Sequence, residues 1–280
     1  MPEYFLFFIL FIAALSHAIC HSLLKHSKNP LGILGITSLF EIIIFTPLVF
    51  YVPFPTPYIW SLVITSTLLH GFYRLLVIYS YRFGDLSFVY PVARGGSSLL
   101  LAIISIIYLT DKISLFGFLA ILIVCFGLFL ISYSKKNKFN KVAFILGLLT
   151  AFMITSYTLV DGIGIRHSDN AYTYLYWMLL LNGTPTLIAS LMFKNTGLRK
   201  INKNLLIKGI GFGVLAPLAY GLVVWCMQYL PIAYASAIRE TSIIFATLIG
   251  LMILKEKEAS SRIIPAIVII IGIGILYFQI

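Results

Sequence analysis

Charged residues are scarce in this chain of 280 residues: they make up 10% of it, and only nine are aspartate or glutamate. Soluble domains carry about 25% charged and 45–50% apolar residues. Here 60% of the residues are hydrophobic, and the mean hydropathy is +1.02. A water-soluble fold of this size could not hide so much apolar surface, so a bilayer must cover much of it. The composition therefore excludes an ordinary soluble domain.

The signatures of common enzymes are also missing. The sequence has no Walker A loop, nucleophile elbow, zinc-protease helix or kinase-type loop. The three cysteines lie inside apolar stretches, as buried small hydrophobes do, rather than as disulfides or metal ligands. Every connection between apolar runs is short, which leaves no room for a soluble catalytic domain. We therefore expect a protein that is not an enzyme and that has no cofactor and no metal.

The formal charge of +11 raises nucleic acid as a partner. The basic residues, however, lie in short runs between apolar stretches, which suits lipid headgroups and membrane topology better. We expect a lipid bilayer and no nucleic acid as the partner of these charges.

Apolar runs long enough to cross the hydrocarbon core as helices recur along the whole chain. The first, after Met1-Pro2-Glu3, lacks the basic region of a signal peptide and is long for one, so we expect it to be a membrane span. Breakers such as Asn29-Pro30 and Leu230-Pro231 separate the runs. Ten spans are predicted, at 4–24, 31–51, 58–81, 86–109, 114–133, 142–163, 171–193, 205–229, 232–254 and 262–279.

The distribution of basic residues predicts the topology. Of the 20 lysines and arginines, thirteen lie in the odd-numbered connections, and Lys208 and Arg262 lie at the span ends next to these connections, which makes fifteen. Two (Lys112 and Arg166) lie in the even connections, and three lie deeper within spans. Because positive loops stay in the cytoplasm, both termini are predicted outside it. The protein is expected in the plasma or inner membrane, as a monomer or homodimer.

The two halves of the chain resemble each other. A shift of 145 positions pairs Arg94 with Arg239, and it also brings Asp111 onto Glu256 and Gly127 onto Gly272. This register predicts two five-helix repeats, 1–136 and 137–280. Because five spans is an odd number, the second repeat must be inverted. The predicted fold class is thus an all-α integral membrane protein of ten helices in two inverted repeats.

Intramembrane charges are costly and usually line a cavity or pair with each other. Arg94 follows Pro91 and precedes a glycine pair, which predicts a broken helix beside a cavity. It is either an anion-binding group of a substrate site or half of a structural ion pair, with Glu41 as a candidate partner. Arg239 and Glu240 are adjacent on one helix, so each should need a different partner. The topology further predicts that Arg94 and Arg239 lie about 5 Å to either side of the midplane.

Other polar residues in the spans are candidates for proton coupling or ion pairing. Glu41 is either a proton-coupling site or a permanent partner of an arginine, and His17 and His21 share one helical face. His70 and Arg74 repeat that spacing in the third span. Aromatic residues near these positions are either substrate walls, including a cation–π box, or simple packing. The proton or ion-pair candidates are Glu41, His17, His21 and His70, and the substrate-binding candidates are Arg94, Arg239, Glu240, Tyr90, Arg74 and Trp225.

The segments 84–95 (GDLSFVYPVARG) and 237–242 (AIRETS), with the charged loops 110–112 and 254–257, resemble the EamA-type transporters of the drug/metabolite transporter superfamily. The resemblance covers nearly the whole length. It implies two five-helix halves around a central cavity and the transport of amino acids, drugs or other metabolites.

These observations together predict a secondary transporter for a small polar metabolite, zwitterionic or anionic, such as an amino acid or phosphonate-like compound. It would work by alternating access, with protons as a candidate coupling ion. Two alternatives stay open: a membrane-embedded enzyme acting on a lipid-type substrate, and an exporter of organic cations or drugs with an aromatic pocket.

Overall fold

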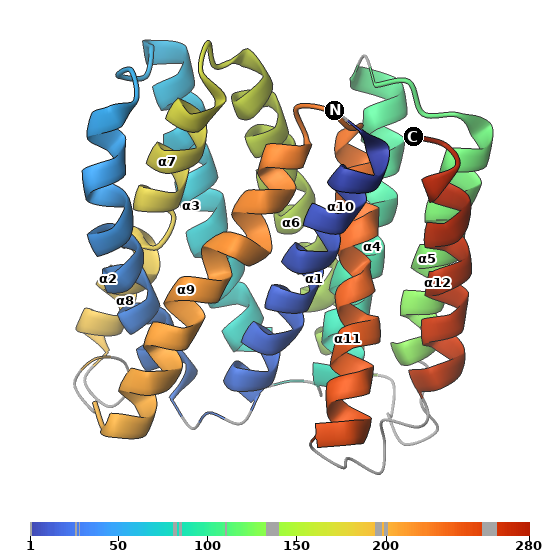
Figure 1. The fold of residues 1–280 in the computed structure, drawn as a ribbon. Coiled ribbons are helices and arrows are strands. Elements are labelled where there is room, and N and C mark those ends of the chain that lie inside the picture. The colour runs from blue at the N-terminus through green and yellow to red at the C-terminus, as the bar shows by residue number, and fades with distance from the viewer. Residues whose placement is uncertain are drawn as a thin grey trace.

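The computed structural model describes residues 2–25, 27, 29–80, 83, 86–109, 111–132, 140–193, 198, 201–253 and 262–280. Within these ranges every regular element is helical (Figure 1). The helices are α1 (Glu3–Lys25), α2 (Pro30–Leu48), η1 (Val49–Tyr51), α3 (Pro57–Ser80), α4 (Leu86–Tyr108), α5 (Leu115–Ser132), α6 (Lys141–His167), α7 (Ala171–Leu181), α8 (Thr184–Met192), α9 (Lys203–Cys226), α10 (Ile232–Ile238), η3 (Arg239–Thr241), α11 (Ser242–Leu248), η4 (Ile249–Ile253) and α12 (Ile263–Tyr277).

These elements form ten membrane-crossing segments, which confirms the predicted all-α membrane fold. Among the described residues, seven segments have the length and hydropathy of a membrane span by themselves, and two shorter apolar helices, Leu115–Ile131 and Ile263–Tyr277, add to them. The tenth crossing is α10–η3–α11–η4, whose breaks divide it into short pieces. Both termini lie at the same end of the bundle, as an even number of crossings requires (Figure 1).

Local sequence explains where several helices begin. Asparagine side chains accept hydrogen bonds from the free backbone N–H groups of the first turn, the strongest type of N-cap. Asn29 does so just before Pro30, whose missing N–H costs nothing at that position. The same cap begins three further helices, with Asn140 on α6, Asn170 on α7 and Asn202 on α9.

The breaks within spans lie elsewhere than the proline pattern predicts. α4 is continuous from Leu86 to Tyr108 with Pro91 inside it, so the prediction of a broken helix at Arg94 is wrong. The seventh span breaks instead at Asn182-Gly183, between α7 and α8. The ninth breaks at Arg239, where one turn of 3-10 helix separates α10 from α11. Broken helices at membrane depth are tolerated where protein surrounds the backbone, and Arg239–Thr241 are buried.

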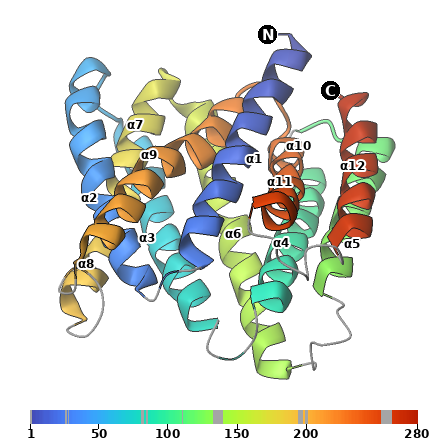
Figure 2. The ribbon, with the colours of Figure 1, turned by 60° about the horizontal axis from the view of Figure 1, so that its bottom comes forward.

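The repeat register of 145 positions is visible in the packing of α5 on α12, which lie side by side (Figure 2). A Cβ on Gly127 would lie 2.7 Å from Ile269, and a Cβ on Gly272 would lie 2.8 Å from Val124. Under the shift, Gly127 corresponds to Gly272 and Val124 to Ile269, so each contact is the image of the other.

Other helix contacts also occur in pairs that correspond when the two halves are exchanged. α6 packs on α3 and α4, and its counterpart α1 packs on α9 and on α10–η3–α11. α2 crosses its own counterpart, α7–α8. The two halves are therefore related by a pseudo-two-fold axis, as expected for repeats of inverted topology. The boundary between 136 and 137 lies outside the described residues and stays a prediction.

Many large apolar side chains lie on the outer surface, and several charged side chains within the spans are buried, the arrangement a bilayer selects. Large hydrophobic residues such as Ile43, Phe72 and Phe126 are exposed, whereas Arg94 and Arg239 are the largest of the fully buried side chains. The fold thus places cations at the interface between the two halves.

Candidate substrate-binding site

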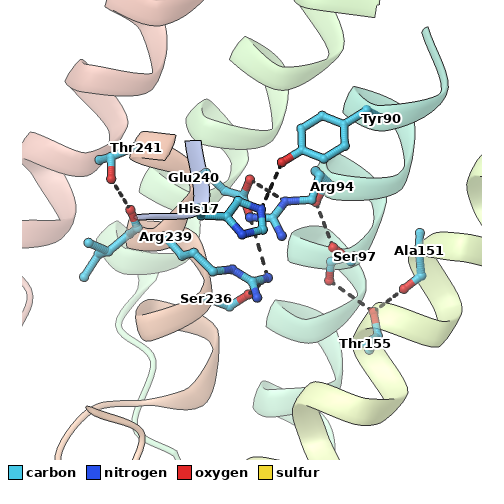
Figure 3. Close-up of polar contacts among 11 residues, drawn as sticks. His17, Tyr90, Arg94, Ser97, Ala151, Thr155, Ser236, Arg239, Glu240 and Thr241 are labelled. Carbon is cyan, nitrogen blue, oxygen red and sulfur yellow. Dashed lines mark hydrogen bonds and ion pairs between the residues drawn. The ribbon is translucent and has the colours of Figure 1, made fainter. Parts of the chain in front are cut away.

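Two arginines from the two repeats converge on one carboxylate (Figure 3). Arg94 on α4 donates from Nε to Glu240 Oε2 at 3.0 Å, and its Nη2 lies 2.9 Å from Glu240 Oε1. Arg239 Nη2 lies 4.0 Å from the same Oε1. The exposed fractions are 1% for each arginine and 0% for Glu240. The cluster therefore holds two buried cations and one buried anion, and it joins the two halves.

This geometry corrects one prediction. The partner of Arg94 is Glu240 rather than Glu41. Both guanidinium groups reach one oxygen atom, which long side chains can do across an offset between their backbones, so the predicted depths of Arg94 and Arg239 relative to the midplane stay a prediction. The prediction that Arg239 and Glu240 would each need a different partner holds for Glu240, whose main partner is Arg94; Arg239 instead lies within 4.0 Å of its neighbour Glu240.

The compensation of Arg239 is incomplete. Its Nη2 is 3.5 Å from Ser236 Oγ, and the guanidinium carbon lies 5.8 Å from the centre of the Tyr220 ring. Its Nε has no hydrogen-bond partner among the described residues. The register explains this imbalance, because the counterpart of Glu240 in the first repeat is Gly95. One carboxylate thus serves two equivalent arginines, and the surplus positive charge falls on Arg239.

His17 and Tyr90 complete this cluster. His17 on α1 lies with Nε2 3.2 Å from the Tyr90 hydroxyl, and the guanidinium carbon of Arg94 lies 5.8 Å from the centre of the Tyr90 ring. Figure 3 shows both side chains directed toward the Arg94–Glu240 pair. The structure thus brings together five of the predicted site residues, His17, Tyr90, Arg94, Arg239 and Glu240. His21 lies on α1 as well, but its side chain is outside what the structure describes.

A second polar centre, which sequence reasoning missed, surrounds Asp161. The predicted span ended two residues after it, whereas α6 continues to His167 and leaves Asp161 fully buried. Hydroxyl groups donate to Oδ1 from Ser66 at 2.5 Å and from Tyr174 at 2.8 Å. The Tyr220 hydroxyl donates to Oδ2 at 2.5 Å, and His70 Nε2 lies 3.1 Å from Oδ2. The available signal was an aspartate inside an apolar run.

The His70 ring is enclosed by tyrosines. It stacks on Tyr157 with ring centres 3.9 Å apart, and it meets the edge of Tyr220 at 5.0 Å. Tyr73 in turn contacts the Tyr157 ring. His70 is the predicted coupling residue that the structure surrounds with polar and aromatic groups from several helices.

Glu41 and Arg74 form a third polar region, where α2 crosses α8. Arg74 Nη1 donates to Thr186 Oγ1 at 3.3 Å, and Thr186 Oγ1 lies 3.2 Å from Ser38 Oγ. Glu41 Oε2 is buried beside Gly183 and has no hydrogen-bond partner in the described part of the chain. The positive charge of Arg74 acts on the buried carboxyl group of Glu41.

Trp225 lies farther along α9, where its ring contacts Tyr229 at 5.2 Å between ring centres. An apolar groove of about 540 Å³ runs between α1, α11 and α12, lined by residues such as Phe7, Phe11 and Ile273.

Among the described residues, no group of three or more His, Cys, Asp and Glu side chains is placed to hold a metal ion. The polar groups described within the spans are thus the arginine cluster, the Asp161 centre and the Glu41–Arg74 region.

Comparison with known proteins bears on what these centres do. Residues 141–278 match the EamA-like transporter family. A solved structure, described only as the crystal structure of a protein, aligns with a TM-score of 0.77 at 11% identity, over 99% of this chain and 96% of its own. That likeness supports the fold alone. No match to a curated protein was found.

The family match covers all five spans of the second repeat, including Arg239 and Glu240, and it agrees with the resemblance carried by 237–242. Residues 141–278 of this multi-pass membrane protein are thus an EamA-like transporter domain, consistent with membership of the drug/metabolite transporter superfamily.

Proposed function

We propose that this protein is a secondary transporter that moves a small zwitterionic or anionic metabolite across the plasma or inner membrane by alternating access. The observation that carries the proposal is Arg239. Its buried guanidinium has no hydrogen-bond partner for Nε in the described part of the chain, and its nearest carboxylate there already pairs with Arg94. A buried cation without a full partner is unfavourable. A carboxylate or phosphonate of the substrate would satisfy it, since either group matches the donor fork of guanidinium.

The position of the ion pair supports alternating access. Arg94 belongs to the first repeat and Glu240 to the second, so rocking of one half against the other must strain or break their contact. An anion that bridges Arg94 and Arg239 would stabilise whichever state brings both near it. The substrate would thereby change the balance between the open states.

A second candidate is export of an organic cation. The observation that favours it is the group of tyrosines 73, 157 and 220 beside the Asp161 carboxylate, since aromatic faces and a carboxylate both attract cations. Asp161 already accepts four hydrogen bonds, however, which uses its acceptor capacity. The surplus charge at Arg239 has no such compensation, so we favour the anionic group.

Uptake into proteoliposomes tests the proposal. The panel contains labelled alanine, glutamate and 2-aminoethylphosphonate, with tetraphenylphosphonium as the organic cation. We expect at least one of the first three to accumulate, and Arg239→Gln to reduce that uptake at least tenfold. Arg239→Lys, which keeps the charge and loses the fork, should retain part of it. Transport of the cation alone, unaffected by Arg239→Gln, would replace this proposal with the second candidate.

A further inference from the structure

Tyr220 connects the arginine cluster to the Asp161 centre. Its hydroxyl donates to Asp161 Oδ2 at 2.5 Å, and its ring lies 5.8 Å from the guanidinium carbon of Arg239. The same ring touches His70. One side chain on α9 therefore contacts the group proposed to hold the substrate anion, a buried carboxylate, and a histidine.

We propose that His70, held by Asp161, binds a proton that travels with the substrate anion, and that Tyr220 links the two sites. The inference rests on the proposed function, because it assumes an anionic group at Arg239. Asp161 is an acceptor, so in the neutral ring Nε2–H donates to it and Nδ1 carries the lone pair. A proton from water on the open side binds at Nδ1, and His70 becomes an imidazolium paired with Asp161.

The charges around His70 come from several packed elements. α6 contributes Asp161 and Tyr157, α9 contributes Tyr220, and α7 contributes Tyr174 through its bond to Asp161. On α3 itself the neighbours are Tyr73 and Arg74, and the charge of Arg239 in η3 also acts on the ring. The sequence of α8, TPTLIASLM, has no titratable side chain. Of these groups, His70 is the one that ordinarily changes charge near neutral pH.

Local charge supports the linkage. The Tyr220 ring contacts both the Arg239 guanidinium and the His70 ring, so an anion bound at Arg239 would lie close to His70. The anion brings one negative charge there, and a proton on His70 brings one positive charge. Since opposite charges attract more strongly in a buried site than in water, each ligand should favour the binding of the other.

Binding of methanesulfonate to the purified wild-type protein tests the linkage, because this probe remains a monoanion between pH 5 and 8. Calorimetry should show that its Kd tightens about tenfold from pH 8 to pH 6. In His70→Gln the Kd should lose its pH dependence. His17→Gln and Glu41→Gln are the controls, since both remove other titratable candidates, and both should keep the pH dependence.

A second measurement follows His70 directly, by nitrogen NMR of histidine-labelled protein, with the resonance assigned by its loss in His70→Gln. Saturating methanesulfonate at fixed pH should increase the protonated fraction of His70, and Tyr220→Phe should weaken that increase. A Kd without pH dependence, or a pH dependence lost in Glu41→Gln or His17→Gln and kept in His70→Gln, overturns the proposal. A His70 resonance that does not change when methanesulfonate is added also overturns the proposal. Failure of methanesulfonate to bind at every pH would instead refute the anion site, and the linkage with it.

Discussion

The Arg94–Glu240 pair should make a large and unequal contribution to stability. Glu240→Gln removes the carboxylate that serves both arginines, so it leaves two buried cations without an ion-pair partner among the described residues. Removing one partner of a buried pair costs about 3–5 kcal/mol, and this variant should lie at the upper end of that range. Arg94→Gln should cost less, because Arg239 lies 4.0 Å from Glu240 and can move toward it.

Arg239→Gln should cost least of the three, because it removes a cation that is poorly compensated. The double variant Arg94→Gln/Glu240→Gln should be more stable than the sum of its single changes predicts, by about 1–3 kcal/mol. Equilibrium unfolding in mixed micelles, in which the fraction of a denaturing detergent is raised, measures all four free energies under one condition.

The order of these effects is what the structure predicts. If Arg239→Gln proved the most destabilising of the single variants, Arg239 would be a structural cation with a full partner. If all three cost less than about 1 kcal/mol, as exposed pairs do, the cluster would be solvated. Measuring stability together with transport also separates the two possible roles of Arg94. If Arg94 binds the substrate, Arg94→Gln should lose uptake while the protein still folds; if it is only half of a structural ion pair, the variant should lose stability.

The remaining predictions concern packing, the Asp161 centre and topology. Gly127→Ala should destabilise the protein by about 1–3 kcal/mol, because the new Cβ would lie 2.7 Å from Ile269 and 3.1 Å from the backbone oxygen of Pro265. Gly274→Ala is the matched control, with nothing within 4 Å; equal melting temperatures for the two variants would contradict this packing. Asp161→Asn should lower stability by about 1–3 kcal/mol, because buried hydroxyl and imidazole donors lose a carboxylate acceptor, and an unchanged thermal melt would show that the centre is wet. C-terminal fusions should give active alkaline phosphatase and no green fluorescence, since the basic connections place both termini outside; bright cytoplasmic fluorescence would refute that topology.

Several features follow from local sequence because they depend on solvent and chain length. A stretch of about 20 apolar residues finds its lowest free energy as a helix in the bilayer whatever its neighbours do. The ten crossings and the register of the repeats could therefore be predicted from the sequence. The charged residues at positions 94, 239 and 240 can also be recognised from the sequence, because each interrupts an apolar run.

Only the tertiary structure decided the partners of those charges. The choice of Glu240 over Glu41 for Arg94 depends on which helices meet and how each is rotated, and neither is encoded in hydropathy. The Asp161 centre was missed because α6 continues six residues beyond this residue, and because its four donors come from three other helices, α3, α7 and α9. Helix continuity through Pro91 and the break at Arg239 were likewise settled by packing, since a buried backbone can keep or lose its hydrogen bonds according to what surrounds it.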